Sequence, residues 1–221
     1  MSIKYVDPYK TTFSYNISVI IFIIFCFIGL PGAFIYSLMA WIVALNRGLV
    51  SDWIWLLFYT TLLISFISII VFTNIRHRKN LNGILTRLKS NLAYDPRPSD
   101  EYYGFNKVTY MGVDTQKGTI LYIAHVDRTG NIFTKDMLIM GFDTSNWRNI
   151  ELKGNSIKIY TKTPDIPFIE FSHKHASHLF ETISAMKGRT YEYELNAPGY
   201  IEHMAKQITK KMGLNLILPR D

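Results

Sequence analysis

Two long apolar runs near the N-terminus constrain this chain more than any other feature. Residues 17–45 carry no charged side chain, and residues 53–75 carry none either. A helix that crosses a bilayer needs about 20 consecutive apolar residues, and both runs meet this length. A secretory signal peptide has an apolar core of only about 7–15 residues followed by a small-residue cleavage site. The first run is too long for such a peptide, so we expect two transmembrane helices.

A proline lies near the middle of the first run, between Gly29 and Gly32. Pro31 lacks a backbone N–H and its ring clashes with the preceding turn, so we expect a kink at this point. The simpler interpretation is a tolerated kink in a long, tilted helix, and the alternative is a functional hinge or a re-entrant turn. The only cysteine, Cys26, lies in the same run. No intramolecular disulfide can therefore form, which agrees with a reducing compartment.

Positive charges beside the second run predict the orientation of the pair. The basic residues that follow this run before the first acidic residue are Arg76, Arg78, Lys79, Arg87 and Lys89. The loop at 46–52 holds only one arginine and one aspartate. Because Lys and Arg resist translocation, the loop should face outward and both termini should face the cytoplasm. This topology predicts a multi-pass protein of a bacterial inner membrane.

The chain divides into six segments on this basis. They are a cytoplasmic N-terminal segment (1–16), a first transmembrane helix (17–45), an outer loop (46–52), a second transmembrane helix (53–75), a basic juxtamembrane helix and linker (76–99) and a cytoplasmic α+β domain (100–221).

The juxtamembrane segment has apolar residues at helical spacing. Ile84, Leu85 and Leu88 predict a cytoplasmic extension of the second transmembrane helix. Its five basic side chains are candidate membrane-surface contacts, because anionic lipid attracts each of them by about 1 kcal/mol. Recognition of a partner protein by this segment is the alternative. Pro96 and Pro98 predict the end of the helix and the linker.

Short runs rich in β-branched and aromatic residues follow the linker. They are residues 105–111, 119–126, 132–140, 147–152, 156–160 and 166–171. Turn signals containing Gly or Asn lie at 127–131 and 153–155, so neighbouring runs should form hairpins of an antiparallel sheet.

Two amphipathic helices should follow the sheet. Ser172 is the expected N-cap of the first, whose apolar stripe includes Leu179, Phe180 and Ile183. The second helix is expected at about 200–212. The predicted fold class is therefore α+β, with two transmembrane helices followed by a cytoplasmic antiparallel sheet and C-terminal helices. A small curled sheet of the pleckstrin-homology type fits this order of elements, and a different α+β sandwich fits it nearly as well.

Little in the sequence indicates chemistry. His173, His175 and His178 are of a residue type that often binds metals, but on a helix His175 and His178 lie about 60° apart and flank the apolar stripe. A solvated polar face is therefore favoured, and no metal site is predicted. The motifs of phosphate-binding loops, nucleophile elbows, zinc proteases and paired-cysteine metal sites do not occur in the sequence. We expect neither catalysis nor a cofactor.

The net charge of +7 raises the question of nucleic-acid binding. Five of the positive charges lie beside the second apolar run, and the rest of the chain is nearly balanced. The aromatic residues of the α+β domain, such as Phe133 and Phe142, are more simply explained as core residues than as base-stacking platforms. No nucleic-acid partner is expected.

The whole chain, with 221 residues and paired N-terminal spans at 17–45 and 53–75, resembles the entry-exclusion (Exc) proteins of I-type conjugative plasmids. No short motif carries this resemblance. It implies an inner-membrane protein of a cell that already holds the plasmid. Such a protein blocks redundant plasmid entry by recognising a membrane component of a donor's conjugative transfer apparatus. The resemblance transfers no role to an individual residue.

The soluble domain is the predicted recognition element, because the outer loop is too short for an interface of about 800 Å² per partner. Turns on a rigid sheet are suited to recognition, so the candidate partner contacts are Trp147, Arg128 and Asn131. At that position, burial of Trp147 in the core is favoured over an exposed contact. Membrane lipids are the other expected partners, and association between copies of the chain is left open. The alternative function is a cytoplasmic lipid- or protein-binding membrane adaptor.

Overall fold

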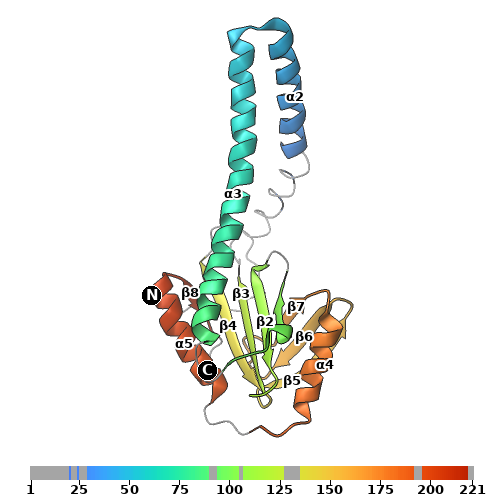
Figure 1. Ribbon diagram of the computed structural model, residues 1–221, viewed down its shortest axis with the longest axis vertical. Helices are drawn as coiled ribbons and strands as arrows, with labels where there is room; N and C mark the ends of the chain where they lie inside the picture. The colour runs from blue at the N-terminus through green and yellow to red at the C-terminus, as the bar shows by residue number, and fades with distance from the viewer. Residues whose placement is uncertain are drawn as a thin grey trace. The chain divides into compact units, whose positions relative to one another are not determined.

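The structure is a computed structural model, drawn as a ribbon in Figure 1. It describes residues 20, 24, 29–89, 94–104, 107–126, 135–191 and 196–218. The chain forms two compact units, one within residues 11–75 and one that contains residues 76–126 and 135–218.

The first unit contains a helical hairpin. Helix α2 (Leu30–Arg47) begins with Pro31 in its first turn, where a missing backbone N–H costs nothing, and it ends at Gly48. Gly48 has a φ of 67° and its N–H donates to the carbonyl of Ala44, which is the left-handed cap that glycine favours. Helix α3 (Val50–Lys89) starts two residues later. The connection is therefore shorter than the predicted loop at 46–52.

The two helices are long and apolar enough to cross a membrane, and most of their large apolar side chains in the first unit are exposed. In the described part of that unit, Arg47 and Asp52 are the charged residues, and both lie at the tip of the hairpin. A helix that is hydrophobic all round is stable only when lipid or protein covers it. This pattern agrees with the two predicted spans, although α2 as described begins at Leu30 rather than at residue 17.

The second unit is built on a five-stranded sheet with the order β1-β2-β3-β4-β8. Its strands are β1 (Glu101–Tyr103), β2 (Thr109–Asp114), β3 (Thr119–His125), β4 (Asp136–Asp143) and β8 (Asn215–Ile217). The pairs from β1 to β4 are antiparallel, and β8 adds to β4 as a parallel edge strand. A short 3₁₀ helix, η2 (Pro98–Asp100), precedes the sheet.

A separate three-stranded antiparallel sheet has the order β5-β6-β7. Its strands are β5 (Trp147–Lys153), β6 (Ser156–Thr161) and β7 (Phe168–Ser172). Gly154, with a φ of 59°, forms the tight turn between β5 and β6, as the Gly-Asn signal predicts. Helix α4 (Ala176–Lys187) follows β7, and α5 (Ala197–Met212) precedes β8.

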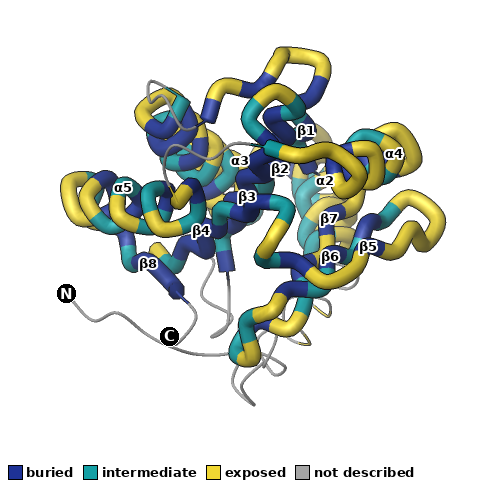
Figure 2. The backbone as a smooth tube through the Cα atoms, turned by 90° about the horizontal axis from the view of Figure 1, so that it is seen from below, coloured by how far each residue is buried: buried dark blue, intermediate teal, exposed yellow. Residues whose placement is uncertain are grey.

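The large sheet is buried on both faces. Along β3, Ile120 and Tyr122 belong to one apolar cluster whereas Leu121 and Ile123 belong to another, because successive side chains of a strand point to opposite faces. The first cluster fills the space between the two sheets and includes Leu179 and Ile183 of α4. Figure 2 shows the strands of the large sheet as the buried centre of this unit. The near-continuous apolar runs of β2 to β4 are typical of such a doubly covered sheet.

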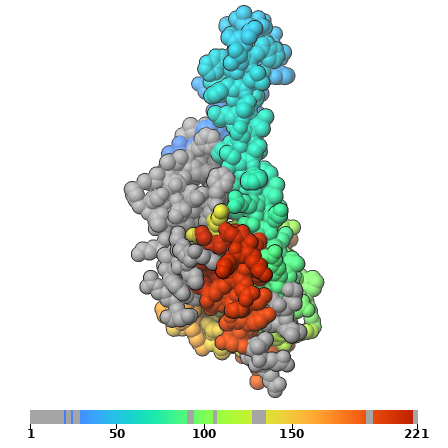
Figure 3. Space-filling model, turned by 90° about the vertical axis from the view of Figure 1, so that its left-hand side faces the viewer, coloured from blue at the N-terminus to red at the C-terminus, as the bar shows by residue number. Residues whose placement is uncertain are grey.

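The C-terminal part of α3 and helix α5 cover the other face of the large sheet. The side chains of α3 that contribute to this second cluster are Leu81, Ile84, Leu85 and Leu88, all nearly inaccessible to solvent. Met212 of α5 lies against Gly83 of α3, and Figure 3 shows the two helices side by side. Residues 76–89 are therefore part of the core of the α+β unit, whereas the sequence pattern placed the start of that domain at residue 100.

Several predicted elements are confirmed and others are corrected. The α+β class, the antiparallel hairpins and both C-terminal helices are confirmed, with boundaries shifted by a few residues. The predicted N-cap Ser172 is wrong, because that residue ends β7 and His175 precedes α4. The short strands β1 and β8 have no counterpart among the predicted runs. The structure has two sheets rather than one, and the likeness to pleckstrin-homology domains stays a prediction.

Candidate recognition surface

The outer face of the three-stranded sheet displays an ordered set of polar and aromatic side chains. The sequence of β6 alternates strictly, so Ile157 and Ile159 point into the core while Lys158 and Tyr160 point outward. Neighbouring strands add residues in register. The outward residues of the face are Asn149, Glu151, Lys153, Ser156, Lys158, Tyr160, Phe168, Glu170 and Ser172.

Lys158 occupies the centre of this face. Its Nζ atom lies 3.8 Å from the centroid of the Phe168 ring and 5.5 Å from that of the Tyr160 ring. Tyr160 and Phe168 are directly opposite each other on β6 and β7, with ring centroids 6.3 Å apart. A cation over an aromatic ring contributes about 0.5–1 kcal/mol at an exposed site. The lysine and the two rings therefore hold one another in place.

Hydrogen bonds connect two further pairs of side chains on this face. The Tyr160 hydroxyl donates to Glu151 Oε2 at 2.8 Å, and Ser156 Oγ donates to Glu170 Oε1 at 2.8 Å. The bond to the Glu151 carboxylate, which favours the protonated phenol, raises the pKa of Tyr160 above its usual value. These two bonds hold Tyr160, Glu151, Ser156 and Glu170 in place. This is a preorganised surface rather than a set of independent mobile side chains.

Trp147 is not part of this surface. Its side chain is only 4% exposed and packs in the cluster between the two sheets, so its assignment as an exposed partner contact is corrected. It begins β5, and the register of that strand shifts between Trp147 and Asn149, which turns the tryptophan inward. Lys187 of α4 lies over the indole ring at 5.3 Å. The other two candidate contacts, Arg128 and Asn131, lie outside the described residues.

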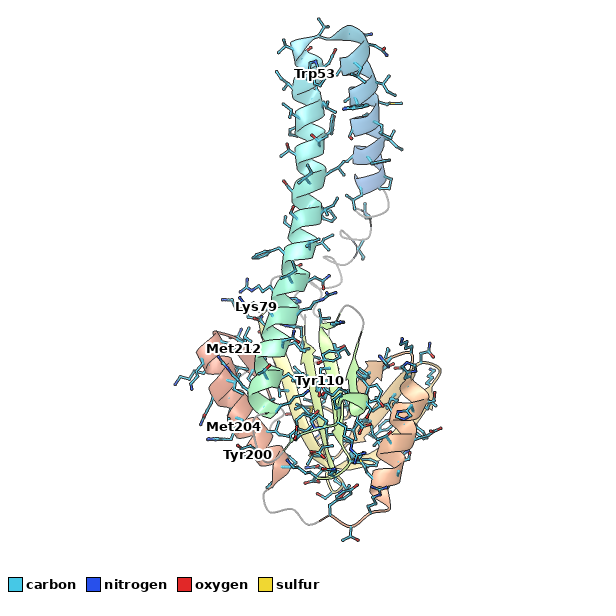
Figure 4. All side chains as sticks on the ribbon, in the orientation of Figure 1. Trp53, Lys79, Tyr110, Tyr200, Met204 and Met212 are labelled. Carbon is cyan, nitrogen blue, oxygen red and sulfur yellow. The ribbon has the colours of Figure 1, made fainter. Side chains whose placement is uncertain are left out.

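The five basic residues predicted to contact the membrane surface have different environments. Lys89 forms an ion pair with Glu101 of β1, and Arg76 is half-buried. Arg78, Lys79 and Arg87 are exposed on α3, and Figure 4 shows Lys79 on the surface of that helix. Lys79 and Arg87 border a shallow hollow beside Gly83. Three of the five are therefore exposed to solvent on this helix.

The histidines near α4 have structural contacts. The Tyr102 hydroxyl lies 2.7 Å from His178 Nδ1, and the ring of His173 packs edge-on against Tyr102 at 5.4 Å. Partial burial lowers the pKa of His173. Within the described ranges, no group of three His, Cys, Asp or Glu residues could hold a metal ion.

A second histidine pair was not found from the sequence. His77 of α3 stacks on His125 of β3 with ring centroids 4.0 Å apart, and burial lowers the pKa of His125 to about 3. The two residues are far apart in the chain and share no motif, so only the long-range packing of α3 on the sheet reveals the pair.

Comparison with known proteins gives one decisive result. A model of the family described as Exclusion-determining protein matches residues 6–220, which is nearly the whole chain. The chain belongs to the exclusion-determining protein family. Membership in this family supports a role in plasmid entry exclusion and confirms the resemblance to entry-exclusion proteins of conjugative plasmids. No curated protein and no solved structure matches the chain.

Proposed function

We propose that this exclusion-determining protein is a non-enzymatic, membrane-anchored recognition protein. Helices α2 and α3 insert it into the bacterial inner membrane with both termini in the cytoplasm, and the α+β unit binds a membrane component of an incoming donor's transfer apparatus. The observation that carries the proposal is the preorganised outer face of β5, β6 and β7, centred on Lys158. Family membership supplies the biological setting, which is plasmid entry exclusion.

The outer face has the properties of a binding surface. Aromatic rings dominate the energetics of many interfaces, and Phe168 and Tyr160 supply two of them on neighbouring strands. Ordering a long side chain on binding costs about 0.5–1.5 kcal/mol. Lys158 and Glu170 are already held by intramolecular contacts, so a partner would meet less of this cost. The two-residue connection between α2 and α3 offers far less area for a partner protein.

A mating assay tests this proposal directly. Recipient cells that produce Lys158→Glu or Phe168→Ala should take up plasmid from a matched donor more often than recipients with the wild-type protein. Loss of one central contact typically costs about 2 kcal/mol, which weakens binding roughly thirtyfold. Lys210→Glu provides the matched control, because this exposed lysine lies on α5, outside the three-stranded sheet. Full exclusion by both face variants, at equal protein levels in the membrane, would contradict the assignment of this face.

A second experiment separates the soluble unit from the spans. Residues 76–221 should transfer specificity when they are exchanged with those of a related protein that excludes a different plasmid. The spans offer mainly Ile, Leu and Phe surfaces, which discriminate poorly between partners. If specificity instead changed only when residues 17–75 were exchanged, recognition would belong to the helical hairpin.

The exposed basic residues on α3 favour a second candidate function, that of a lipid-binding membrane adaptor. Arg78, Lys79 and Arg87 could each gain about 1 kcal/mol beside an anionic bilayer. Replacing all three by Gln should then weaken membrane binding of the α+β unit in a salt-dependent manner. A cell that produces this triple variant and still excludes plasmid normally would separate lipid contact from exclusion.

A further inference from the structure

A small pocket lies between α2 and α3, near the tip of the hairpin. Its volume is about 220 Å³. The pocket is lined by Tyr36, Met39, Ala40 and Val43 of α2 and by Asp52, Trp55 and Tyr59 of α3.

Asp52 places a carboxylate oxygen inside the hairpin without a partner. Its Oδ2 atom is buried and accepts no hydrogen bond from the residues that the structure describes. The position of Asp52 in the first turn of α3 suits a negative charge, because the N-terminal end of a helix carries a partial positive charge. Burial of a carboxylate oxygen without a hydrogen bond is nevertheless costly. The wall of the pocket thus contains a carboxylate oxygen without a hydrogen bond.

Aromatic rings form much of the wall around this carboxylate. The rings of Tyr36 and Tyr59 stack with centroids 5.8 Å apart and an interplanar angle of 16°. Trp55 lies against Tyr59 with a centroid separation of 6.0 Å. The faces of Tyr and Trp rings attract cations, and aromatic cages are a known means of binding alkylammonium groups. A carboxylate and three such rings around one small pocket match an ammonium ion of few carbon atoms.

We propose that the tip of the hairpin binds an ethanolamine phospholipid, with the ammonium group of the lipid in the pocket formed by Asp52, Tyr36, Trp55 and Tyr59. The inference rests on the membrane insertion of α2 and α3 proposed above, but not on recognition of a transfer apparatus.

Two observations favour a lipid over a protein side chain as the source of the ammonium group. The helices around the pocket expose apolar side chains such as Ile35, Leu38 and Trp41, which lipid would surround in a membrane. Arg47 also lies at the hairpin tip, at the end of α2. One positive and one negative residue at the same level complement a zwitterionic headgroup, since the arginine can meet the phosphate and the aspartate the ammonium group.

Native mass spectrometry of the full-length protein tests this inference. The protein is extracted from nanodiscs that contain equal amounts of phosphatidylethanolamine and phosphatidylglycerol, and the retained lipids are counted. The wild type should retain phosphatidylethanolamine about tenfold more often than phosphatidylglycerol, as expected for a combined ionic and cation–π contact. Replacement of the ethanolamine lipid by its N-acetylated form, which lacks the positive charge, should abolish this preference.

Asp52→Asn keeps the shape of the side chain and removes its charge, so it should also abolish the preference. Asp95→Asn is the matched control, because it makes the same change at an exposed position of the other unit. Equal retention of both lipids by the wild type, or an unchanged preference in Asp52→Asn, would overturn the inference. Displacement of the lipid by free ethanolamine would show a site for small amines and would overturn the assignment to a lipid. Carbonate extraction of the membranes distinguishes the two proposals, because release of the protein would refute the anchoring itself.

Discussion

Removal of the C-terminal part of α3 should unfold the α+β unit. Leu81, Ile84, Leu85 and Leu88 are at most 4% exposed, and all four pack on the large sheet. Full burial of one such side chain contributes about 1.5–3 kcal/mol, so the four together contribute roughly 6–12 kcal/mol. The whole free energy of unfolding of a domain is only about 5–15 kcal/mol. A fragment that starts at residue 100 should therefore lack a stable fold, whereas one that starts at residue 76 should have one.

Urea unfolding of the two fragments, followed by circular dichroism, measures this difference. Residues 76–221 should unfold in one cooperative transition, and residues 100–221 should show no such transition. Leu81→Ala in the longer fragment should cost about 2–5 kcal/mol, because the side chain is fully buried. Asn82→Ala, on the exposed side of the same helical turn, should change the stability by no more than about 0.5 kcal/mol. Equal midpoints for the two fragments would refute the assignment of residues 76–89 to the core.

Three further predictions concern groups inside the α+β unit. His125 has a pKa of about 3 in the folded chain and about 6.5 when unfolded, so only the unfolded chain gains the proton as the pH falls below about 6.5. Stability should therefore fall with decreasing pH by up to about 1.4 kcal/mol per unit, and His125→Phe should flatten this dependence in urea midpoints measured between pH 7.5 and pH 5. Tyr94 and Tyr110 share a buried hydroxyl–hydroxyl hydrogen bond of 2.8 Å, so either single change to Phe should cost about 1–3 kcal/mol and the double change less than the sum in a double-mutant cycle. Phe180 is only partly buried whereas Ile183 is fully buried, so Phe180→Ala should lower the melting temperature less than Ile183→Ala does.

The local patterns predicted most of the regular elements. Strict alternation in β6 and the apolar stripe of α4 are properties of a few consecutive residues, and the structure confirms both. Asp114 and Asp143 lie at turns, and their carboxylates accept hydrogen bonds from the backbone N–H groups of residues that follow them. In contrast, β8 has only three residues and pairs in parallel with β4 across more than 70 positions of sequence. No local pattern marks such a long-range pair.

The recognition surface was predicted only in part. The sequence predicts a rigid sheet with displayed side chains. It offers Trp147 as a candidate contact but favours a buried position for it, and the structure confirms the burial. The inward turn depends on the register shift between Trp147 and Asn149, which a sequence of seven strand residues does not reveal. Lys158, Tyr160 and Phe168 were not identified either. Their association depends on which residues of β6 and β7 lie opposite each other, and register is set by the whole sheet.

The C-terminal part of α3 shows why one pattern supported two interpretations. An apolar stripe flanked by basic residues fits a helix at a membrane surface, because lipid covers the stripe and anionic headgroups attract the charges. The same stripe fits a helix packed on a sheet, because a protein core is equally apolar. In the structure, this apolar stripe packs against Tyr110, Leu121 and Ile139 of the large sheet. Lipid therefore cannot cover the stripe in this fold. Lys79 lies exposed on the opposite side of the helix, where a membrane surface or a partner can reach it, whereas Lys89 is paired with Glu101. Any contact of this segment with the bilayer must therefore be electrostatic and should weaken as the salt concentration rises.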